Sequence, residues 1–372
     1  MCIRDSNDTE AFILDIWKKV LSVEAVGIDD DFFDMGGHSL KAVQLMAEIK
    51  KLKGINIPLA SLISNSTVRT FAPLLISKTK DELWHCLVPI RPNGTKTPLF
   101  LIHGAGLNIL LYQSLTYHLK QDRPIYAFQA KGLDGKSDLA GSIEEMADDY
   151  IEEIKKILPQ GPYMLLGFSL GGFIAYDMAK KLTNEGNKVI FTGVIDSFTS
   201  IARHIQSPVK SMLFNFRSAL IKPFYVLWLL LLAPWSEKRQ LFLNKYKSLR
   251  FTLIYNLIKL GLMKEKERKI IIDDGVPMFL SENVEIVMSE ALYKYQLVPS
   301  SIKLDLFKAG KPTFYIPNRK DYGWNRFAGK GVIVHTLPTE HSRIFAPPND
   351  KLFAEILDQR IAEVEAELKN QK

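Results

Sequence analysis

The sequence predicts an α/β protein whose mostly parallel sheet follows a small four-helix domain. From Pro98 onward, apolar runs of strand length alternate with helix-like segments, which is typical of a parallel sheet covered on both faces. Residues 9–80 hold only short helix-like segments. Hydrophobic residues make up 47% of the 372 residues and charged residues 24%, values that exclude wholesale disorder.

The first domain is predicted to span residues 7–80. Its four helices are expected to begin at Thr9, Ser39, Pro58 and Thr67, from apolar spacing and start signals. Residues 81–96 carry Pro89, Pro92 and an Asn93-Gly94 turn, so they are predicted to form a linker that runs into a first hairpin.

The second domain is predicted to span residues 97–372. A segment of about residues 199–300 interrupts its alternation with helical, aromatic-rich sequence. The predicted strands are Leu99–His103, Ile125–Gln129, Tyr163–Gly167, Val189–Asp196, Thr313–Ile316 and Val332–Leu337, and the predicted helices include Ser142–Leu158, Gly172–Thr183 and Asp350–Lys369.

The net charge of +7 is concentrated in one segment. Residues 201–270 hold 14 Lys and Arg against 3 Asp and Glu, while the rest of the chain is slightly acidic. A nucleic-acid binder is therefore not predicted, since no zinc-finger, RNP or KH signature accompanies the basic segment. Two cysteines exclude a disulfide framework and a Cys-based zinc site, and no metal site is predicted.

The ends and apolar runs of the chain bear on its location. Residues 1–6, Met-Cys-Ile-Arg-Asp-Ser, resemble the translation of a sequencing-transposon adapter, so we expect them to be an artefact and the natural chain to continue upstream of Asn7; the alternative is an ordinary start codon. No secretory signal is visible. The longest apolar stretch, Pro223–Trp235, has 13 residues, which is short of a membrane span. We expect a cytoplasmic protein.

The first motif with chemistry is the segment Asp30–Leu40, which ends in Phe-Phe-Asp-Met-Gly-Gly-His-Ser-Leu. The two glycines allow a tight turn, after which Ser39 begins a helix whose free amides favour a phosphate ester. A plain N-cap serine would leave the acidic-aromatic lead-in unexplained. The segment resembles the peptidyl carrier (thiolation) domain of nonribosomal peptide synthetases. That resemblance implies that a phosphopantetheinyl transferase attaches 4′-phosphopantetheine to Ser39.

The second motif is Gly167–Gly171, a G-x-S-x-G element around Ser169. An apolar strand-like run precedes it and a helix-like segment follows, as a nucleophile elbow requires. A serine hydroxyl needs a base and an orienting carboxylate to act as a nucleophile. Asp196 ends the next predicted strand and is the preferred acid, with Asp321 as the rival.

Seven histidines compete for the role of base. His341 follows the last predicted strand and completes the order Ser, Asp, His, so it is the preferred candidate. The others are His38, His85, His103, His118, His204 and His335. Acyl transfer also needs two oxyanion donors, which are expected to be the amides of Leu170 and of Ala105 in the loop His103–Gly106.

Residues from about Val88 to Leu368 resemble the terminal thioesterase domain of nonribosomal peptide synthetases, an α/β-hydrolase. Phe100–Gly104, Gly167–Gly172, Asp196 and His341–Asn349 carry this resemblance. The family often has Gly-Asp before the histidine, whereas this chain has Thr-Glu. The resemblance implies that residues 199–300 form a helical lid. For its basic, apolar segment we favour a buried lid helix over an acyl tunnel or a contact with anionic membranes.

Together the two resemblances imply chain release in nonribosomal peptide or hybrid peptide–polyketide synthesis. A thioester on the Ser39 arm would pass to Ser169 and then leave by hydrolysis or macrocyclisation, and upstream condensation and adenylation domains would be partners. The alternatives are a proofreading thioesterase, a general serine carboxylesterase that ignores the carrier, and a carrier docking module without catalysis.

Overall fold

The structure is a computed structural model, and the chain divides into two compact units, residues 1–204 with 280–372 and residues 205–279. The predicted strand Thr313–Ile316 and most of the predicted lid lie outside the described residues. Those residues are 3–37, 39–55, 57, 61–76, 86–105, 109–120, 122–131, 140–199, 224, 231, 238, 282–311, 318 and 320–370.

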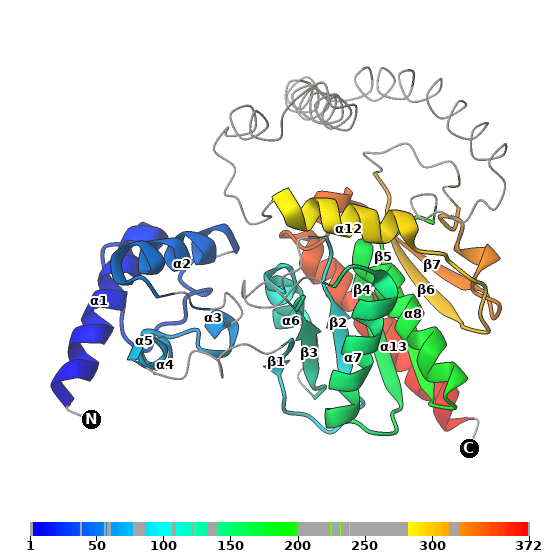
Figure 1. The fold of residues 1–372 in the computed structure, drawn as a ribbon, viewed down its shortest axis with the longest axis horizontal. Coiled ribbons are helices and arrows are strands. Elements are labelled where there is room, and N and C mark those ends of the chain that lie inside the picture. The colour runs from blue at the N-terminus through cyan, green and yellow to red at the C-terminus, as the bar shows by residue number, and fades with distance from the viewer. Residues whose placement is uncertain are drawn as a thin grey trace. The chain divides into compact units, whose positions relative to one another are not determined.

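The N-terminal region is helical (Figure 1). Its described helices are α1 (Ile3–Leu21), α2 (Ser39–Lys53) and three one-turn helices, α3 (Ser61–Ser64), α4 (Val68–Phe71) and α5 (Pro73–Ile76). The start of α2 at Ser39 agrees with the prediction, whereas α1 begins six residues before Thr9. Trp17 and Phe32 are fully buried and meet edge to face at 5.0 Å between ring centroids, so the loop before α2 packs against the helical core.

The rest of the described chain is built on a seven-stranded mixed sheet with strand order β1-β3-β2-β4-β5-β6-β7. The strands β2 to β7 run parallel, and β1 pairs antiparallel with β3 at one edge. The strand bounds are β1 Leu87–Arg91, β2 Leu99–Ile102, β3 Ile125–Phe128, β4 Tyr163–Phe168, β5 Val189–Ile195, β6 Leu304–Ala309 and β7 Val332–Leu337.

Helices cover both faces of this sheet, as Figure 1 shows. Side chains alternate along β2, so that Phe100 and Ile102 pack with α7 and α8 while Leu99 and Leu101 pack with α6 and α13. Both faces are therefore buried, as parallel strands require. The helix bounds are α6 Gln113–His118, α7 Ile143–Ile157, α8 Leu170–Asn184, α12 Glu282–Lys294 and α13 Asn349–Lys369, and the 3-10 turns are η2 Leu110–Tyr112, η3 Trp324–Arg326 and η4 His341–Arg343.

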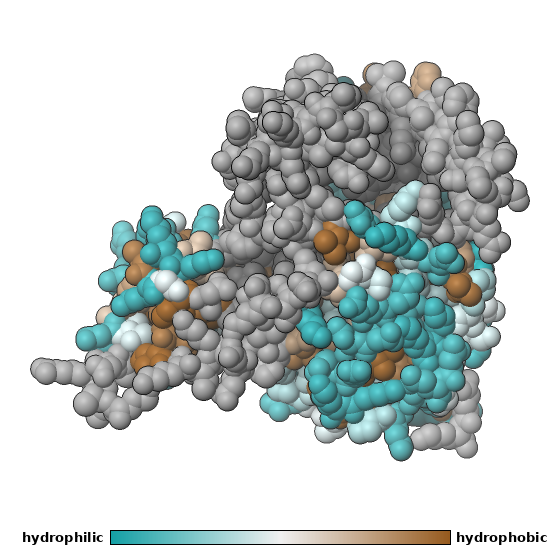
Figure 2. Space-filling view, in the orientation of Figure 1, coloured by the Kyte–Doolittle hydropathy of each residue, from teal (hydrophilic) through white to brown (hydrophobic). Residues whose placement is uncertain are grey.

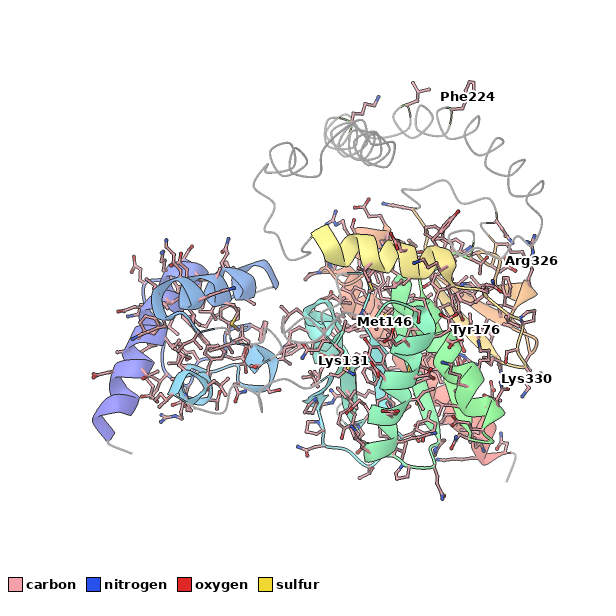
Figure 3. The ribbon with its side chains drawn as sticks, in the orientation of Figure 1. Lys131, Met146, Tyr176, Phe224, Arg326 and Lys330 are labelled. Atoms are coloured by element: carbon pink, nitrogen blue, oxygen red, sulfur yellow. The ribbon has the colours of Figure 1, made fainter. Side chains whose placement is uncertain are left out.

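The helix α7 shows how sequence sets these elements. Ser142 caps it by accepting a hydrogen bond from the Glu145 amide at 3.1 Å, and acidic residues in the first turn and lysines in the last complement the helix dipole. Its buried face includes Met146, which belongs to the same core cluster as Tyr176 of α8; Figure 3 labels both residues. The outward faces of both helices are mostly hydrophilic (Figure 2).

The helix α12 returns the chain from the predicted lid to β6. The residue that follows it, Tyr295, is buried and donates a hydrogen bond to Asp177 of α8 at 3.0 Å. Tyr176 of α8 bonds the carbonyl of Val298 at 2.9 Å. On the outgoing side, the Thr199 amide donates to the carbonyl of Tyr322 at 3.0 Å. The described residues at both ends of the predicted lid are thus hydrogen-bonded to the part of the chain that contains the sheet.

Two strands were not predicted from the sequence. The first, β1, lies inside residues 81–96, where a linker that runs into a first hairpin was expected; β1 instead pairs with β3, and its Leu87 and Val88 are buried. The second, β6, carries Asp305 and Lys308 and lies between β5 and β7. No helix in the described part of the chain is long and apolar enough to span a membrane.

Candidate active site

The strand β4 ends at Phe168, and the next residue, Ser169, has φ 53° and ψ −112°. Such a positive φ is strained for a residue with a side chain. The turn is tightly packed, because a Cβ on Gly167 would contact the carbonyl of Gly171. Ser169 is held by its amide, which donates to the carbonyl of Ile195 at 2.8 Å, and by its carbonyl, which accepts from the Ser197 hydroxyl at 2.6 Å. These contacts fix the serine at the carboxyl edge of the sheet.

Asp196 and His341 meet at the same edge. Asp196 follows β5, and its Oδ2 lies 2.7 Å from His341 Nδ1. Its other oxygen, Oδ1, accepts a hydrogen bond from the Ala309 amide at 2.6 Å. The aspartate side chain is 4% exposed and the histidine side chain 22%. Since a carboxylate can only accept, Nδ1 carries a proton and Nε2 of the neutral ring bears the lone pair.

An aromatic side chain links the serine turn to this histidine. The Phe168 ring, one residue before Ser169, stacks on the His341 ring with centroids 4.7 Å apart and an interplanar angle of 24°. Phe345 meets the same phenylalanine edge to face at 5.0 Å. The His341 ring is therefore held on one side by the carboxylate of Asp196 and on its face by the residue that precedes the serine.

The two backbone amides expected to act as oxyanion donors follow neighbouring strands. Leu170 is the first residue of α8, and the first amides of a helix have no partner within it. Ala105 is exposed and follows β2, whose last residue, Ile102, pairs with Gly167 of β4. Because β2 and β4 are neighbouring parallel strands, both amides stand at the same sheet edge as Ser169.

The segment before Ser39 is also tightly held. Gly36 has φ 83°, and a Cβ on Gly37 would contact the backbone carbonyl and ring of Phe32. The Gly37 amide donates to the same carbonyl at 2.8 Å, so this turn delivers Ser39 to the start of α2. A serine among free helix-start amides suits a phosphate ester; His38 and the side chain of Ser39 lie outside the described part of the chain.

Two protein-family models match this chain, one over the region around Ser39 and one over the region around Ser169. A model described as phosphopantetheine attachment site matches residues 11–75, and a model described as thioesterase domain matches residues 97–214. The chain carries a carrier domain followed by a thioesterase domain. The mixed sheet and the serine turn described above are those of the α/β-hydrolase fold of the thioesterase domain.

Relatives that this chain resembles include peptide synthetases. The chain is 40% identical over 206 residues to malpibaldin synthetase of Mortierella alpina, covering 54% of this chain and 4% of the relative. It is 39% identical over 189 residues to a dimodular nonribosomal peptide synthase of Bacillus subtilis, covering 51% of this chain and 8% of the relative. The chain thus spans less than a tenth of the length of each.

A solved structure resembles nearly the whole chain. The crystal structure of a holo four-domain nonribosomal peptide synthetase bound to AMP and glycine covers 94% of this chain, with 26% identity and a TM-score of 0.53. The similarity extends over 26% of that longer chain. The order of carrier domain and thioesterase domain therefore has a counterpart in a multidomain synthetase.

The rival residues of the thioesterase domain have other partners. Asp321 accepts from Asn318 at 2.6 Å and from the Gly323 amide at 2.9 Å, which closes a turn. His335 bonds Asp305 at 2.9 Å. His118 lies 3.6 Å from the Asp350 carboxylate. His85 and His204, like His38, lie outside the described residues.

One buried residue of the thioesterase domain was assigned no role by the sequence reasoning. His103 directly follows β2 and is fully buried, with Nδ1 2.8 Å from the Gly104 carbonyl and Nε2 2.5 Å from the Tyr150 hydroxyl. Burial lowers the pKa of this histidine to about 4, so the ring is neutral near pH 7. The sequence signal was its place directly before the glycine-rich loop.

Proposed function

We propose that this chain releases an acyl or peptidyl chain from a carrier-bound thioester at the end of nonribosomal peptide or hybrid peptide–polyketide synthesis. The observation that carries the proposal is the 2.7 Å contact between Asp196 and His341 Nδ1 at the sheet edge where the strained Ser169 turn begins α8. Serine, aspartate and histidine in this chain order are the nucleophile, orienting acid and base of α/β-hydrolases.

Ser39 would hold 4′-phosphopantetheine, attached by a phosphopantetheinyl transferase, and the thiol of that group would carry the acyl chain as a thioester. The glycine turn against Phe32 and the start of α2 at Ser39 support this assignment. A carrier joined to its own hydrolase raises the effective substrate concentration without tight binding.

The thioesterase residues then have distinct roles. His341 Nε2 takes the Ser169 proton as Oγ bonds to the thioester carbonyl, and the amides of Leu170 and Ala105 stabilise the oxyanion. His341 returns the proton to the departing sulfur when the carbon–sulfur bond breaks. Water or a nucleophile of the acyl chain next attacks the Ser169 ester; its proton passes through His341 to Oγ as the ester bond breaks. Asp196 holds the base throughout.

We also propose the domain limits. Residues 7–80 form the carrier as a four-helix domain, 81–96 connect it, and 97–372 form the thioesterase domain with a helical lid at about 199–300. The edge strand β1, residues 87–91, adds the second half of that connection to the sheet. Condensation and adenylation domains upstream would be partners, in the cytoplasm.

Intact-protein mass spectrometry tests this proposal. A promiscuous phosphopantetheinyl transferase would transfer acyl-phosphopantetheine from an acyl-coenzyme A to the wild type, Ser39→Ala, Ser169→Ala and the control Ser342→Ala, whose hydroxyl bonds Glu340 at 3.1 Å. We expect Ser39→Ala to stay unloaded, Ser169→Ala to keep its acyl mass, and the wild type and control to lose it. Equal loss from wild type and Ser169→Ala would refute release by Ser169, and loading of Ser39→Ala would refute the carrier site.

A further inference from the structure

The residue that the mechanism leaves unused is His103, which stands between β2 and the loop that holds Ala105. Its ring meets the Tyr150 ring edge to face at 5.8 Å, and Tyr150 is itself stacked on Phe128 with centroids 4.2 Å apart and an interplanar angle of 12°. Both ring nitrogens of His103 are hydrogen-bonded, and the tyrosine that bonds one of them is itself held by a stacked ring. A fully buried imidazole in so complete a set of contacts has a fixed orientation.

The hydrogen bonds also fix the position of its proton. The carbonyl of Gly104 can only accept, so His103 Nδ1 must be the donor across the 2.8 Å contact. In a neutral ring Nε2 then carries the lone pair, and the Tyr150 hydroxyl donates to it at 2.5 Å. Burial raises the pKa of Tyr150 well above its ordinary value, so that hydroxyl keeps its proton.

The carbonyl that His103 binds belongs to the same peptide group as the Ala105 amide. The cis peptide bonds of the described chain lie elsewhere, at Gly161-Pro162 and Pro347-Pro348. In a trans peptide the carbonyl and the N–H point in opposite directions. Holding the Gly104 carbonyl against the buried ring therefore turns the Ala105 N–H away from the core.

The other side of this peptide is held as well. A Cβ on Gly104 would lie 2.8 Å from Cδ1 of Phe168, and the Phe168 ring stacks on His341. The Gly104–Ala105 peptide thus lies between a buried hydrogen-bonding ring and an aromatic ring that touches the proposed base. Rotation of the peptide would break the first contact and crowd the second.

We propose that His103 is a positioning residue. It aims the Ala105 amide at the oxyanion that forms when Ser169 attacks the acyl carbonyl. The inference rests on the proposed acyl-transfer function. Preorganised donors act because they need no reorientation as charge develops, and a misplacement of about 1 Å can cost roughly 10²-fold in rate.

The test is a double-mutant cycle in the full chain, with a p-nitrophenyl acyl ester as the probe. Ala105→Pro removes the N–H, so kcat should fall about 10²–10³-fold. His103→Leu should lower kcat at least about tenfold with KM unchanged. In the Ala105→Pro background His103→Leu should have less than about a twofold further effect, because the two changes disable one donor.

A conservative pair guards against misfolding of the leucine variant. The side-chain amide of His103→Asn can donate from near the Nδ1 position, so kcat should stay close to wild type. His103→Gln places its donor near the Nε2 position instead, so its kcat should fall roughly tenfold. Thermal unfolding of each variant shows that the assay temperature is below its melting range.

The outcomes separate this inference from the proposed function. Loss of hydrolysis in Ser169→Ala together with an unchanged kcat in His103→Gln would overturn the positioning role and leave the release function standing. A His103→Leu effect that persists in full on Ala105→Pro would overturn it too, since the residue would act elsewhere. Hydrolysis at the wild-type rate by Ser169→Ala would instead refute the proposed function.

Discussion

Replacing Asp196 by asparagine should abolish the base function of His341 while leaving the local packing intact. The Ala309 amide donates to Asp196 Oδ1 at 2.6 Å, and an amide N–H requires an acceptor there. The oxygen of the new side chain must therefore face Ala309, which turns its NH₂ group toward His341 Nδ1. That nitrogen must then accept, and the proton of the neutral ring moves to Nε2, the atom that should take the serine proton.

The expected loss is large because the wrong tautomer cannot act as a base. A carboxylate-to-amide change in a Ser-His-Asp triad lowers kcat by about 10⁴-fold, which corresponds to about 5 kcal/mol of transition-state stabilisation. The buried side chain keeps both hydrogen bonds. It still accepts from the Ala309 amide, and it donates to His341 Nδ1 where aspartate accepted. The melting temperature should therefore change little.

The assay is steady-state hydrolysis of an acyl-pantetheine thioester, with thermal unfolding beside it. Asp321→Asn is the matched control, because Asp321 accepts from Asn318 and the Gly323 amide instead of from a histidine; its kcat should stay within a few-fold of wild type. A kcat of Asp196→Asn within about tenfold of wild type, or a greater loss in Asp321→Asn, would refute the assignment of the acid.

Three further outcomes are expected from stability measurements. Gly172→Ala places a Cβ against the Ser197 side chain and should destabilise the fold by about 1–3 kcal/mol; an unchanged urea midpoint would contradict the packing described. Tyr295→Phe removes the hydroxyl that donates to buried Asp177 and should cost about 1–3 kcal/mol, which urea melts would show. Because burial lowers the pKa of His103 from 6.5 to about 4, the unfolded chain binds a proton at pH values where the folded chain does not. The free energy of unfolding should thus decrease as the pH is lowered from 6.5 to 4, by up to about 3 kcal/mol more than in His103→Asn. The same dependence of unfolding free energy on pH in the two proteins would contradict this.

Long strands with uniform apolar sequence could be predicted, but β6 could not. Its Asp305 and Lys308 interrupt the apolar run. Such a mixed pattern is typical of a loop. The structure buries Asp305 because Arg360 of α13 lies 2.7 Å from it and His335 of β7 lies 2.9 Å away. These compensating groups are distant in the sequence, so no local pattern reveals that the charge is neutralised.

The edge strand β1 was obscured by turn-forming residues. Pro89 lies within it, and proline is tolerated in a sheet mainly on edge strands. Because β1 is the edge strand of the described sheet and pairs there with β3, the missing N–H of Pro89 costs no bond on an inner ladder. Turn signals at Pro92 and Gly94 then led the sequence reasoning to a linker.

Much of the candidate site follows from chain order, and the rest depends on tertiary contacts. Ser169, Asp196 and His341 follow three parallel strands, and the carboxyl ends of such strands share one edge. The second bond on Asp196 comes from Ala309, at the end of the unpredicted β6. The burial of His103 depends on Tyr150, which is 47 residues away on α7. Neither contact could be predicted from the sequence, because each joins residues that are far apart in the chain.

The hydrogen bonds at both ends of the predicted lid define a segment that could be replaced as a unit. The chain leaves the sheet unit after β5 and returns to β6, and these two strands are neighbours. Thr199 is tied to Tyr322 on the outgoing side, and Tyr295 is tied to Asp177 on the return. A change of length within residues 205–279 therefore breaks no ladder bond between the described strands, and closing a longer loop costs little entropy. Exchanging this stretch for another should therefore leave the contact between Asp196 and His341 in place.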